Sequence, residues 1–368
     1  MKLKELILRE IKGIWGGELV DGEIGTPVIK TNNMTYGGYL DISDLTYRKI
    51  PLAKLNACLL SNGDMLVEKS GGTKTHSVGY VNLFNLESDK YVANNFILVL
   101  RPSKAMVEPR YLFYQLRYKY ESGQIEHLHN QTTGIQNLKV QMYLDQEINY
   151  CSLADQEKIS HTLENIEKII EKESQELSLL DALIKSRFIE LFDGKFPAES
   201  LYSVCEELFA GGDVKKDDLS EEKDDEHPYP IFTNGEANDG LYGYTSKARV
   251  FKEAVTVSGR GTIGYTSLRS EPFYPAVRLI VAVPNQKLID ACYLKYFIQS
   301  KNYGGSGSSI PQLTVPMIKN ELIPVPPMEK QLEFKTFIHE IDKLKFNVQK
   351  RIEKYKELLN KKMDEYFN

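Results

Sequence analysis

The feature that most constrains the fold of this chain is the uninterrupted helical stretch from Asp155 to Phe192, which contains neither glycine nor proline. Its apolar residues recur at alternating steps of three and four, which is the spacing of a helix that packs along another helix. At a rise of about 1.5 Å per residue, such a helix is roughly 57 Å long. One compact domain does not need a helix of this length, so we expect it to space two parts of the molecule.

A second stretch of the same kind, Glu329–Phe367, supplies the partner helix. A shift of about 175 positions places Ile135 on Ile310 and Gln156 on Gln331 without a gap, which indicates an internal repeat. The first stretch carries nine acidic and five basic residues and the second carries eight and ten, so their net charges are opposite and suit pairing. The predicted contact seams consist of Leu163, Ile166, Ile170, Leu177 and Ile184 in the first helix and Ile338, Ile341, Val348, Ile352 and Leu359 in the second.

Strand and turn signals upstream of each long helix also recur in the same order. Pro230–Gly235 repeats the pattern of Pro27–Asn32, Val255–Gly261 that of Met65–Gly71, Ile263–Tyr265 that of Val78–Tyr80, and Tyr293–Gln299 that of Leu112–Tyr118. Tyr39–Ile42 is predicted to be a further strand of the first unit. We therefore expect two similar globular α/β units related by a pseudo-two-fold repeat and joined by two long antiparallel helices. The expected boundaries are 1–153, 154–193, 194–327 and 328–368.

Length and composition agree with two cores, because the 368 residues are 42% hydrophobic. No apolar run approaches the ~20 residues of a membrane span, and Met1–Gly13 does not resemble a signal peptide. The four cysteines are widely spaced, so the sequence predicts neither a zinc site nor a disulfide framework. A reducing cytoplasm is the expected location.

The net charge of −5 is carried by one segment, Asp213–Glu226, which holds eight acidic and three basic residues. The remainder is neutral, which permits DNA binding through local patches. We interpret the acidic segment as a solvated insertion rather than a metal site.

The chain resembles the specificity (S) subunit of type I restriction-modification systems. The matching pieces are the strand–turn pattern around Gly63-Asp64 and Ser70-Gly71-Gly72, the junctions 132–138 (TTGIQNL) and 308–315 (SSIPQLTV), and Leu322–Pro327 followed by Glu329-Lys330-Gln331. The resemblance covers essentially the whole chain. It implies that each globular unit is a target recognition domain that reads one half of a split sequence in double-stranded DNA. It further implies that the helices set the unread spacer and dock two methyltransferase subunits, which restriction/translocase subunits join. Such a chain is not itself an enzyme and binds neither S-adenosylmethionine nor ATP.

Gly259–Gly264 spells G-x-G-x-x-G, yet the following residues continue as a strand, whereas a dinucleotide site requires the motif to open a helix. We interpret this segment as a glycine turn that carries Arg260 at its tip. Arginine can contact guanine with two hydrogen bonds or pair with a phosphate. The alternative is an exposed turn with a solvated arginine.

Other candidate DNA contacts are small hydroxyl, lysine and asparagine side chains on turns, since asparagine can read adenine but is also a routine turn residue. Gln136 and Gln312, at the junctions with the helices, could meet DNA or tie the structure together. The predicted DNA-binding residues are Thr31, Asn32, Asn33, Lys69, Ser70, Gly71, Gly72, Thr73 and Lys74 in the first unit and Thr233, Asn234, Arg260 and Thr262 in the second.

The sequence contains no methyltransferase motif of the Asn-Pro-Pro-Tyr type, no P-loop and no metal-ligand spacing. Catalysis is therefore expected from partner subunits, with no cofactor bound by this chain. Two alternatives remain at this point. The first is a structural adaptor that holds two peptide- or protein-binding domains on a coiled-coil ruler, and the second is a nucleotide-dependent enzyme that uses the glycine turn.

Overall fold

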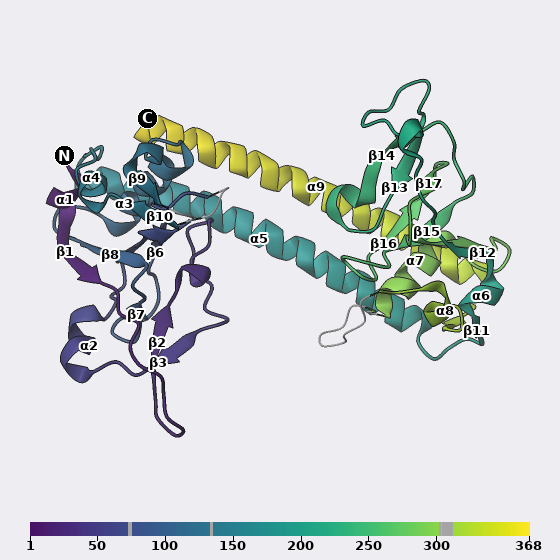
Figure 1. Ribbon diagram of the computed structural model, residues 1–368, viewed down its shortest axis with the longest axis horizontal. Helices are drawn as coiled ribbons and strands as arrows, with labels where there is room; N and C mark the ends of the chain where they lie inside the picture. Colours follow the sequence, from purple (N-terminus) through teal and green to yellow (C-terminus); the bar gives the residue numbers. More distant parts are fainter. Residues whose placement is uncertain (73–75, 133–134, 302, 304–311) are drawn as a thin grey trace. The chain divides into compact units, whose positions relative to one another are not determined.

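The computed structural model describes residues 1–72, 76–132, 135–301, 303 and 312–368. These residues form two compact units (Figure 1). Unit 1 comprises Met1–Lys172 with Arg351–Asn368, and unit 2 comprises Glu173–Lys350. Each unit therefore contains one part of each long helix.

Unit 1 is built on a four-stranded antiparallel sheet with the order β1-β8-β4-β6. Two three-stranded sheets, β3-β2-β7 and β5-β10-β9, adjoin it, and β2 pairs in parallel with β7. The strands are β1 (Ile7–Lys12), β2 (Thr26–Ile29), β3 (Thr46–Arg48), β4 (Met65–Glu68), β5 (Ser70–Gly71), β6 (Val81–Leu83), β7 (Val92–Ala93), β8 (Ile97–Pro102), β9 (His129–Thr132) and β10 (Ile135–Leu138).

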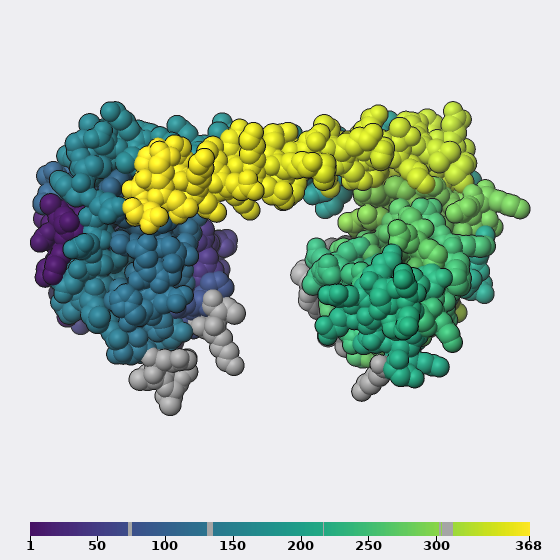
Figure 2. Space-filling model, turned by 90° about the horizontal axis from the view of Figure 1, so that it is seen from above, coloured from purple at the N-terminus to yellow at the C-terminus, as the bar shows by residue number. Residues whose placement is uncertain are grey.

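The core of unit 1 lies between the four-stranded sheet and its helices, and it includes Leu163 from α5 and Leu359 from α9. Figure 2 shows the C-terminal turns of α9 (yellow) against the part of unit 1 coloured blue. The helices are α1 (Leu3–Leu6), α2 (Leu52–Cys58), α3 (Pro109–Glu121), α4 (Val140–Leu144), α5 (Leu153–Phe192) and α9 (Met328–Phe367), with 3-10 turns η1 (Thr31–Asn33) and η2 (Glu126–Leu128).

Unit 2 repeats this architecture with the sheets β12-β18-β15-β16 and β14-β13-β17, and a two-stranded sheet, β11-β19, adjoins them. The strands are β11 (Ala198–Ser200), β12 (Cys205–Ala210), β13 (Tyr229–Phe232), β14 (Leu241–Thr245), β15 (Ala254–Val257), β16 (Thr266–Arg269), β17 (Tyr274–Pro275), β18 (Ile280–Pro284) and β19 (Leu322–Pro324). The helices are α6 (Leu201–Val204), α7 (Ala291–Ser300) and α8 (Val315–Ile318), with 3-10 turns η3 (Lys216–Asp218) and η4 (Ala237–Gly240).

The repeat extends to single hydrogen bonds at the start of each long helix. The buried Gln156 accepts a bond from the backbone N–H of Glu108, which caps α3 (2.9 Å). In unit 2 the buried Gln331 accepts one from the backbone N–H of Asp290, which caps α7 (2.8 Å). These contacts and the shared strand order confirm the predicted duplicated α/β fold.

Both predicted long helices are present, and within each unit their segments run in opposite directions. In unit 2, Asp181 of α5 pairs with Lys345 of α9, and six residues further along α5, Arg187 pairs with the earlier Glu333 (3.0 Å). The seam residues Leu163, Ile166, Ile184, Ile338, Ile341, Val348, Ile352 and Leu359 are buried, whereas Ile170 and Leu177 are half-buried.

Two details of the sequence prediction were wrong. Tyr39–Ile42 is not a strand, because Gly38 (φ +85°) and the hydrogen bond from the Asn82 amide to the Tyr39 carbonyl hold the segment before it in a tight turn. The strand that pairs with β2 is instead β3, Thr46–Arg48.

The second error is a shift of one residue in the repeat between α3 and α7. The hydroxyl of Tyr111 donates to the carbonyl of Asn149 (2.8 Å), and that of Tyr293 donates to the carbonyl of Pro324 (2.9 Å). Tyr293 therefore corresponds to Tyr111 rather than to Leu112.

None of the helices in the described ranges combines the length and the low charge that crossing a membrane requires.

Candidate nucleic-acid interface

The glycine turn of unit 2 leaves β15 and leads directly to β16, so it opens a strand and not a helix. The backbone N–H of Gly259 donates to Asn234 Oδ1 (2.8 Å), and a Cβ at Gly259 would lie 2.8 Å from the carbonyl oxygens of Arg278 and Leu313. Only glycine fits this close approach. As a result, the tip of the turn, with Arg260 and Thr262, is exposed to solvent.

The guanidinium of Arg260 contacts the side chain of Gln312, since its Nη2 donates to Gln312 Oε1 (3.2 Å). Arginine is only a donor, so this contact directs the amide oxygen of Gln312 toward Arg260. The other N–H groups of an exposed guanidinium can turn to a ligand, such as a base edge or a phosphate.

The turn in unit 1 begins at Lys69, whose backbone N–H donates to the carbonyl of Phe96 (2.9 Å). The hydroxyl of Ser70 donates to Asn137 Oδ1 (2.8 Å). Gly71 and Gly72 follow with φ values of +132° and +70°, which only glycine adopts readily. The predicted contacts Thr73 and Lys74 lie outside the described residues.

The two turns occupy equivalent positions. Leu138 N–H donates to the carbonyl of Lys69 (2.8 Å), and Leu313 N–H donates to the carbonyl of Gly259 (2.8 Å). Further along, Gly79 N–H donates to the carbonyl of Glu68 (2.8 Å). The same bond joins Gly264 to the carbonyl of Ser258 (2.9 Å). The predicted match of Val255–Gly261 to Met65–Gly71 is therefore correct to the residue.

The predicted asparagine contacts have different surroundings. The side chain of Asn33 is 3% exposed, accepts from Lys30 N–H (2.9 Å) and donates to the carbonyls of Asp41 and Asp44 (2.9 Å each). Its amide thus holds the turn together and has no surface from which to reach a base in this conformation.

Asn234 is also engaged, since in addition to its bond from Gly259 it donates to the carbonyl of Val277 (3.0 Å). Asn32 is exposed, while Thr31 and Thr233 are half-buried, and these three stay candidates for DNA contact.

The sequence did not predict an ion pair beside the turn of unit 2, the clamp formed by the buried Arg269 and the exposed Asp239. The guanidinium of Arg269 lies 3.6 Å from the ring centroid of Phe232 and donates to the carboxylate and the backbone carbonyl (2.7 Å) of Asp239. Asp239 also accepts from Tyr265 and Ser267 (2.8 Å each), and these donors hold its pKa below the usual range despite partial burial. Asp239 has a φ of +50°, and the contacts of the clamp offset the strain of this backbone conformation.

The corresponding region of unit 1 joins a turn to the long helix. Glu167 of α5 accepts hydrogen bonds from the hydroxyls of Tyr39 (2.5 Å) and Tyr114 (2.6 Å) and from Arg117 Nη1 (2.6 Å). On the other side of this turn, the ring of Tyr36 stacks on His76 with centroids 3.8 Å apart. The tyrosines of this turn thus contact His76 on one side and α5 on the other within unit 1.

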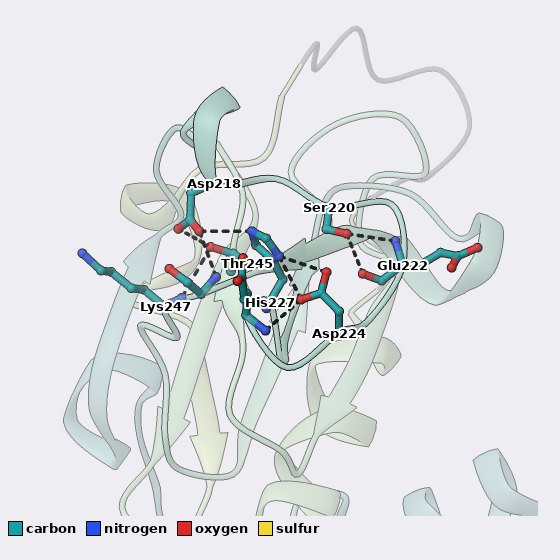
Figure 3. A network of polar contacts seen from close by, with 9 residues as sticks. Asp218, Ser220, Glu222, Asp224, His227, Thr245 and Lys247 are labelled. Atoms are coloured by element: carbon teal, nitrogen blue, oxygen red, sulfur yellow. Dashed lines mark hydrogen bonds and ion pairs between the residues drawn. The ribbon is translucent and has the colours of Figure 1, made fainter.

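The acidic segment Asp213–Glu226 is anchored at the end of β14 (Figure 3). Asp218 accepts from the hydroxyl of Thr245 (2.8 Å) and the backbone N–H of Ser246 (3.1 Å), and Asp224 accepts from the backbone N–H of His227 (2.6 Å). The bonds from Ser246 and Thr245 lower the pKa of Asp218, and those from His227 lower the pKa of Asp224. Within the described part of the chain, no group of three or more His, Cys, Asp or Glu side chains is arranged to hold a metal ion.

Comparison with known proteins identifies the family of these two units. The family model for the type I restriction modification DNA specificity domain matches residues 18–180 and 201–357. A Mycoplasma pneumoniae protein named as type I specificity subunit S.MpnORF89P is 27% identical over 316 residues, which cover 80% of this chain and 91% of that protein. A second protein of the same organism, named as type I specificity subunit S.MpnORF507P, is 25% identical over 296 residues, covering 78% and 79% of the two chains.

Solved structures show the same fold. One comes from work on complex assembly and conformational transition of the type I R-M system, with a TM-score of 0.63, 15% identity, and 100% and 97% of the two chains covered. Another is the type I restriction-modification S subunit from M. genitalium, with a TM-score of 0.55, 16% identity, and 100% and 95% covered. The chain belongs to the family of type I restriction-modification specificity subunits, in which it serves DNA sequence recognition.

Proposed function

We propose that the chain reads an asymmetric, bipartite target in double-stranded DNA, with one half-site for each unit and an unread spacer between them. The observation that supports this most directly is the pair of equivalent glycine turns. Each leaves the equivalent strand of the equivalent sheet, β4 or β15, yet one carries Ser70 and the other Arg260. Equivalent frames with different side chains suit two independent readers of different sequences.

We assign the target recognition domains to 1–153 and 194–327 and the spacer helices to 154–193 and 328–368. The helices would set the length of the spacer, since the distance between two readers on DNA must match the duplex repeat of roughly 34 Å per turn. Insertion of one heptad in each helix would lengthen each by about 10 Å. The unread gap would then grow by about three base pairs at ~3.4 Å each.

Methyltransferase subunits, two per chain, would dock along the same helices, and restriction/translocase subunits would join them. Exposed apolar side chains on the helices of unit 2 support this role. Leu179 (69% exposed) and Leu183 lie one turn apart on α5, and Phe346 (59% exposed) lies on α9. Large exposed apolar groups on a helix are typical of contact sites for other proteins. Leu179→Glu should therefore reduce copurification of the methyltransferase subunit, whereas Leu8→Glu, at an equally exposed position on β1, should not.

Catalysis would come entirely from these partners in the cytoplasm, and the chain itself would bind neither S-adenosylmethionine nor ATP. The remaining predicted contacts, Thr31, Asn32, Lys69, Gly71, Gly72, Thr233 and Thr262, would approach the phosphates and base edges together with Ser70 and Arg260.

The decisive experiment is selection from a random-sequence duplex library by the full chain assembled with its methyltransferase subunits. Two short specific blocks at a fixed separation are expected. Recovery without any sequence preference would refute the proposal and favour an adaptor that binds peptides or proteins.

A further inference from the structure

The equivalent turns place two pairs of polar side chains at the same position in the two units. The carbonyls of Lys69 and Gly259 anchor the two turns by accepting from the N–H groups of Leu138 and Leu313. In each unit, the residue that follows the anchoring carbonyl bonds to the residue that precedes the anchoring leucine. The pair is Ser70 with Asn137 in unit 1 (2.8 Å) and Arg260 with Gln312 in unit 2 (3.2 Å).

We propose that these are the base-reading pairs of the two units, with Asn137 reading adenine in one half-site and Arg260 reading guanine in the other. This inference rests on the proposed function and goes beyond it by naming residues and bases. Asn137 takes the adenine-reading role predicted above for asparagines such as Asn33 and Asn234, because the amides of these two are bonded to the backbone.

The chemistry of each pair matches its base. Adenine presents N7 as an acceptor and the N6 amino group as a donor, and an asparagine amide satisfies both. In unit 1 the hydroxyl of Ser70 donates to Asn137 Oδ1, which orients the amide and leaves its second lone pair for N6 and its Nδ2 for N7. Guanine presents only acceptors, O6 and N7, and the fork of a guanidinium supplies two parallel donors.

Gln312 acts as a positioning residue for Arg260. A free arginine side chain loses rotamer entropy when it is held in one geometry, and a contact that already restrains it reduces this loss on binding. The bond from Arg260 to Gln312 is such a restraint. The shorter pair Ser70–Asn137 needs less restraint, because serine and asparagine have fewer rotatable bonds.

Neither reading side chain is needed by the frame. Arg260 and Asn137 are exposed, and the bonds that fix the turns belong to the backbone of Lys69, Gly259 and the two leucines. Substitution at the reading positions should therefore change the base read without unfolding the unit.

The test uses the full chain assembled with its methyltransferase subunits and a random-sequence duplex library. Arg260→Lys keeps the charge but removes the bidentate fork, so enrichment of G·C at one position of one block should fall about tenfold. Exchange of the pair, with R260S and Q312N together, should replace G·C by A·T at that position and leave the other block unchanged. Arg249→Lys, at another exposed arginine of unit 2, is the matched control.

The outcomes distinguish failure of the reading pairs from failure of the proposed function. Wild-type selection of two blocks, with both blocks unaltered by Arg260→Lys and by the exchange, would overturn the reading pair and leave the proposed function standing. Loss of both blocks in Arg260→Lys with an unchanged melting temperature would also overturn it, because a general phosphate contact would explain that result. Failure of the wild-type chain to select any block would overturn the proposed function and the pair together.

Discussion

The buried glutamines at the starts of the two long helices allow the duplicated frame to be tested quantitatively. Gln331 is 0% exposed, and its Nε2 donates to the carbonyls of Leu288 (2.9 Å) and Pro326 (2.8 Å). Its Oε1 accepts from the N–H of Asp290, so the side chain satisfies three backbone groups. Gln331→Leu keeps the volume but leaves all three without a partner.

An unsatisfied buried polar group costs about 1–3 kcal/mol, and two of the three bonds of Gln331 lie in fully buried surroundings. We therefore expect Gln331→Leu to lower the free energy of unfolding of unit 2 by roughly 4 kcal/mol. For units of this size, 1 kcal/mol corresponds to a shift of about 2–4 °C in Tm, so the transition of unit 2 should fall by about 10 °C.

The equivalent substitution in unit 1 is the internal comparison. Gln156 makes two of these bonds, to the carbonyl of Cys151 (2.8 Å) and from the N–H of Glu108, and both are only partly buried. Gln156→Leu should therefore cost roughly 2 kcal/mol in unit 1. Gln286→Leu, at an exposed position, should leave both transitions unchanged.

Calorimetry and urea titration of the three variants measure these differences. Equal losses of unfolding free energy for Gln331→Leu and Gln156→Leu would refute the expectation that the number and burial of the lost hydrogen bonds determine the destabilisation. Losses no larger than that of Gln286→Leu would refute the structural role of both glutamines.

Three further predictions concern unit 1. Tyr114→Phe removes a hydrogen bond to the carboxylate of Glu167, so urea titration should show a loss of about 2 kcal/mol. Gly38→Ala places a Cβ 2.4 Å from the ring of Phe113 at a φ of +85°. The free energy of unfolding should fall by roughly 1–3 kcal/mol, and an unchanged Tm would refute the close approach of Gly38 to Phe113. Burial raises the pKa of Glu68 in the folded protein. The contribution of Glu68 to the free energy of unfolding is therefore fully present below the pKa of the unfolded state, about 4.3, and is lost as pH rises through the pKa of the folded state. Glu68→Gln should therefore raise Tm at pH 8 and not at pH 4.

The long helices could be predicted from sequence because apolar residues at steps of three and four, in a stretch without glycine or proline, line up on one face only in an α-helix. The glycine turns could also be matched to the residue, since Val67 and Gly71 in unit 1 have the same spacing as Val257 and Gly261 in unit 2. The match of α3 to α7 failed by one residue because an apolar helix face tolerates such a shift. The hydroxyl partners of Tyr111 and Tyr293 and the caps Glu108 and Asp290 fix the register.

The candidate site was less predictable because residue type alone does not say where a side chain's hydrogen bonds go. Asn33 and Asn137 look alike in the sequence, yet one amide is buried among three backbone groups and the other is exposed. Arg269 and Asp239 are 30 positions apart, and no local pattern links them. The turn signal Asn238-Asp239-Gly240 predicts a turn there but not the clamp that holds it.

The division of labour between backbone and side chains explains how one frame can serve two specificities. The turns are held by carbonyls of Lys69 and Gly259 and by N–H groups of Leu138 and Leu313, which every non-proline residue type possesses. The residues beside these anchors can therefore differ completely, as Ser70 and Arg260 do, at little cost in stability. A duplicated chain can then diverge at its reading positions while each unit keeps its fold. We accordingly expect base preference to follow the few exposed residues beside the anchors, and stability to follow the anchors and the buried glutamines.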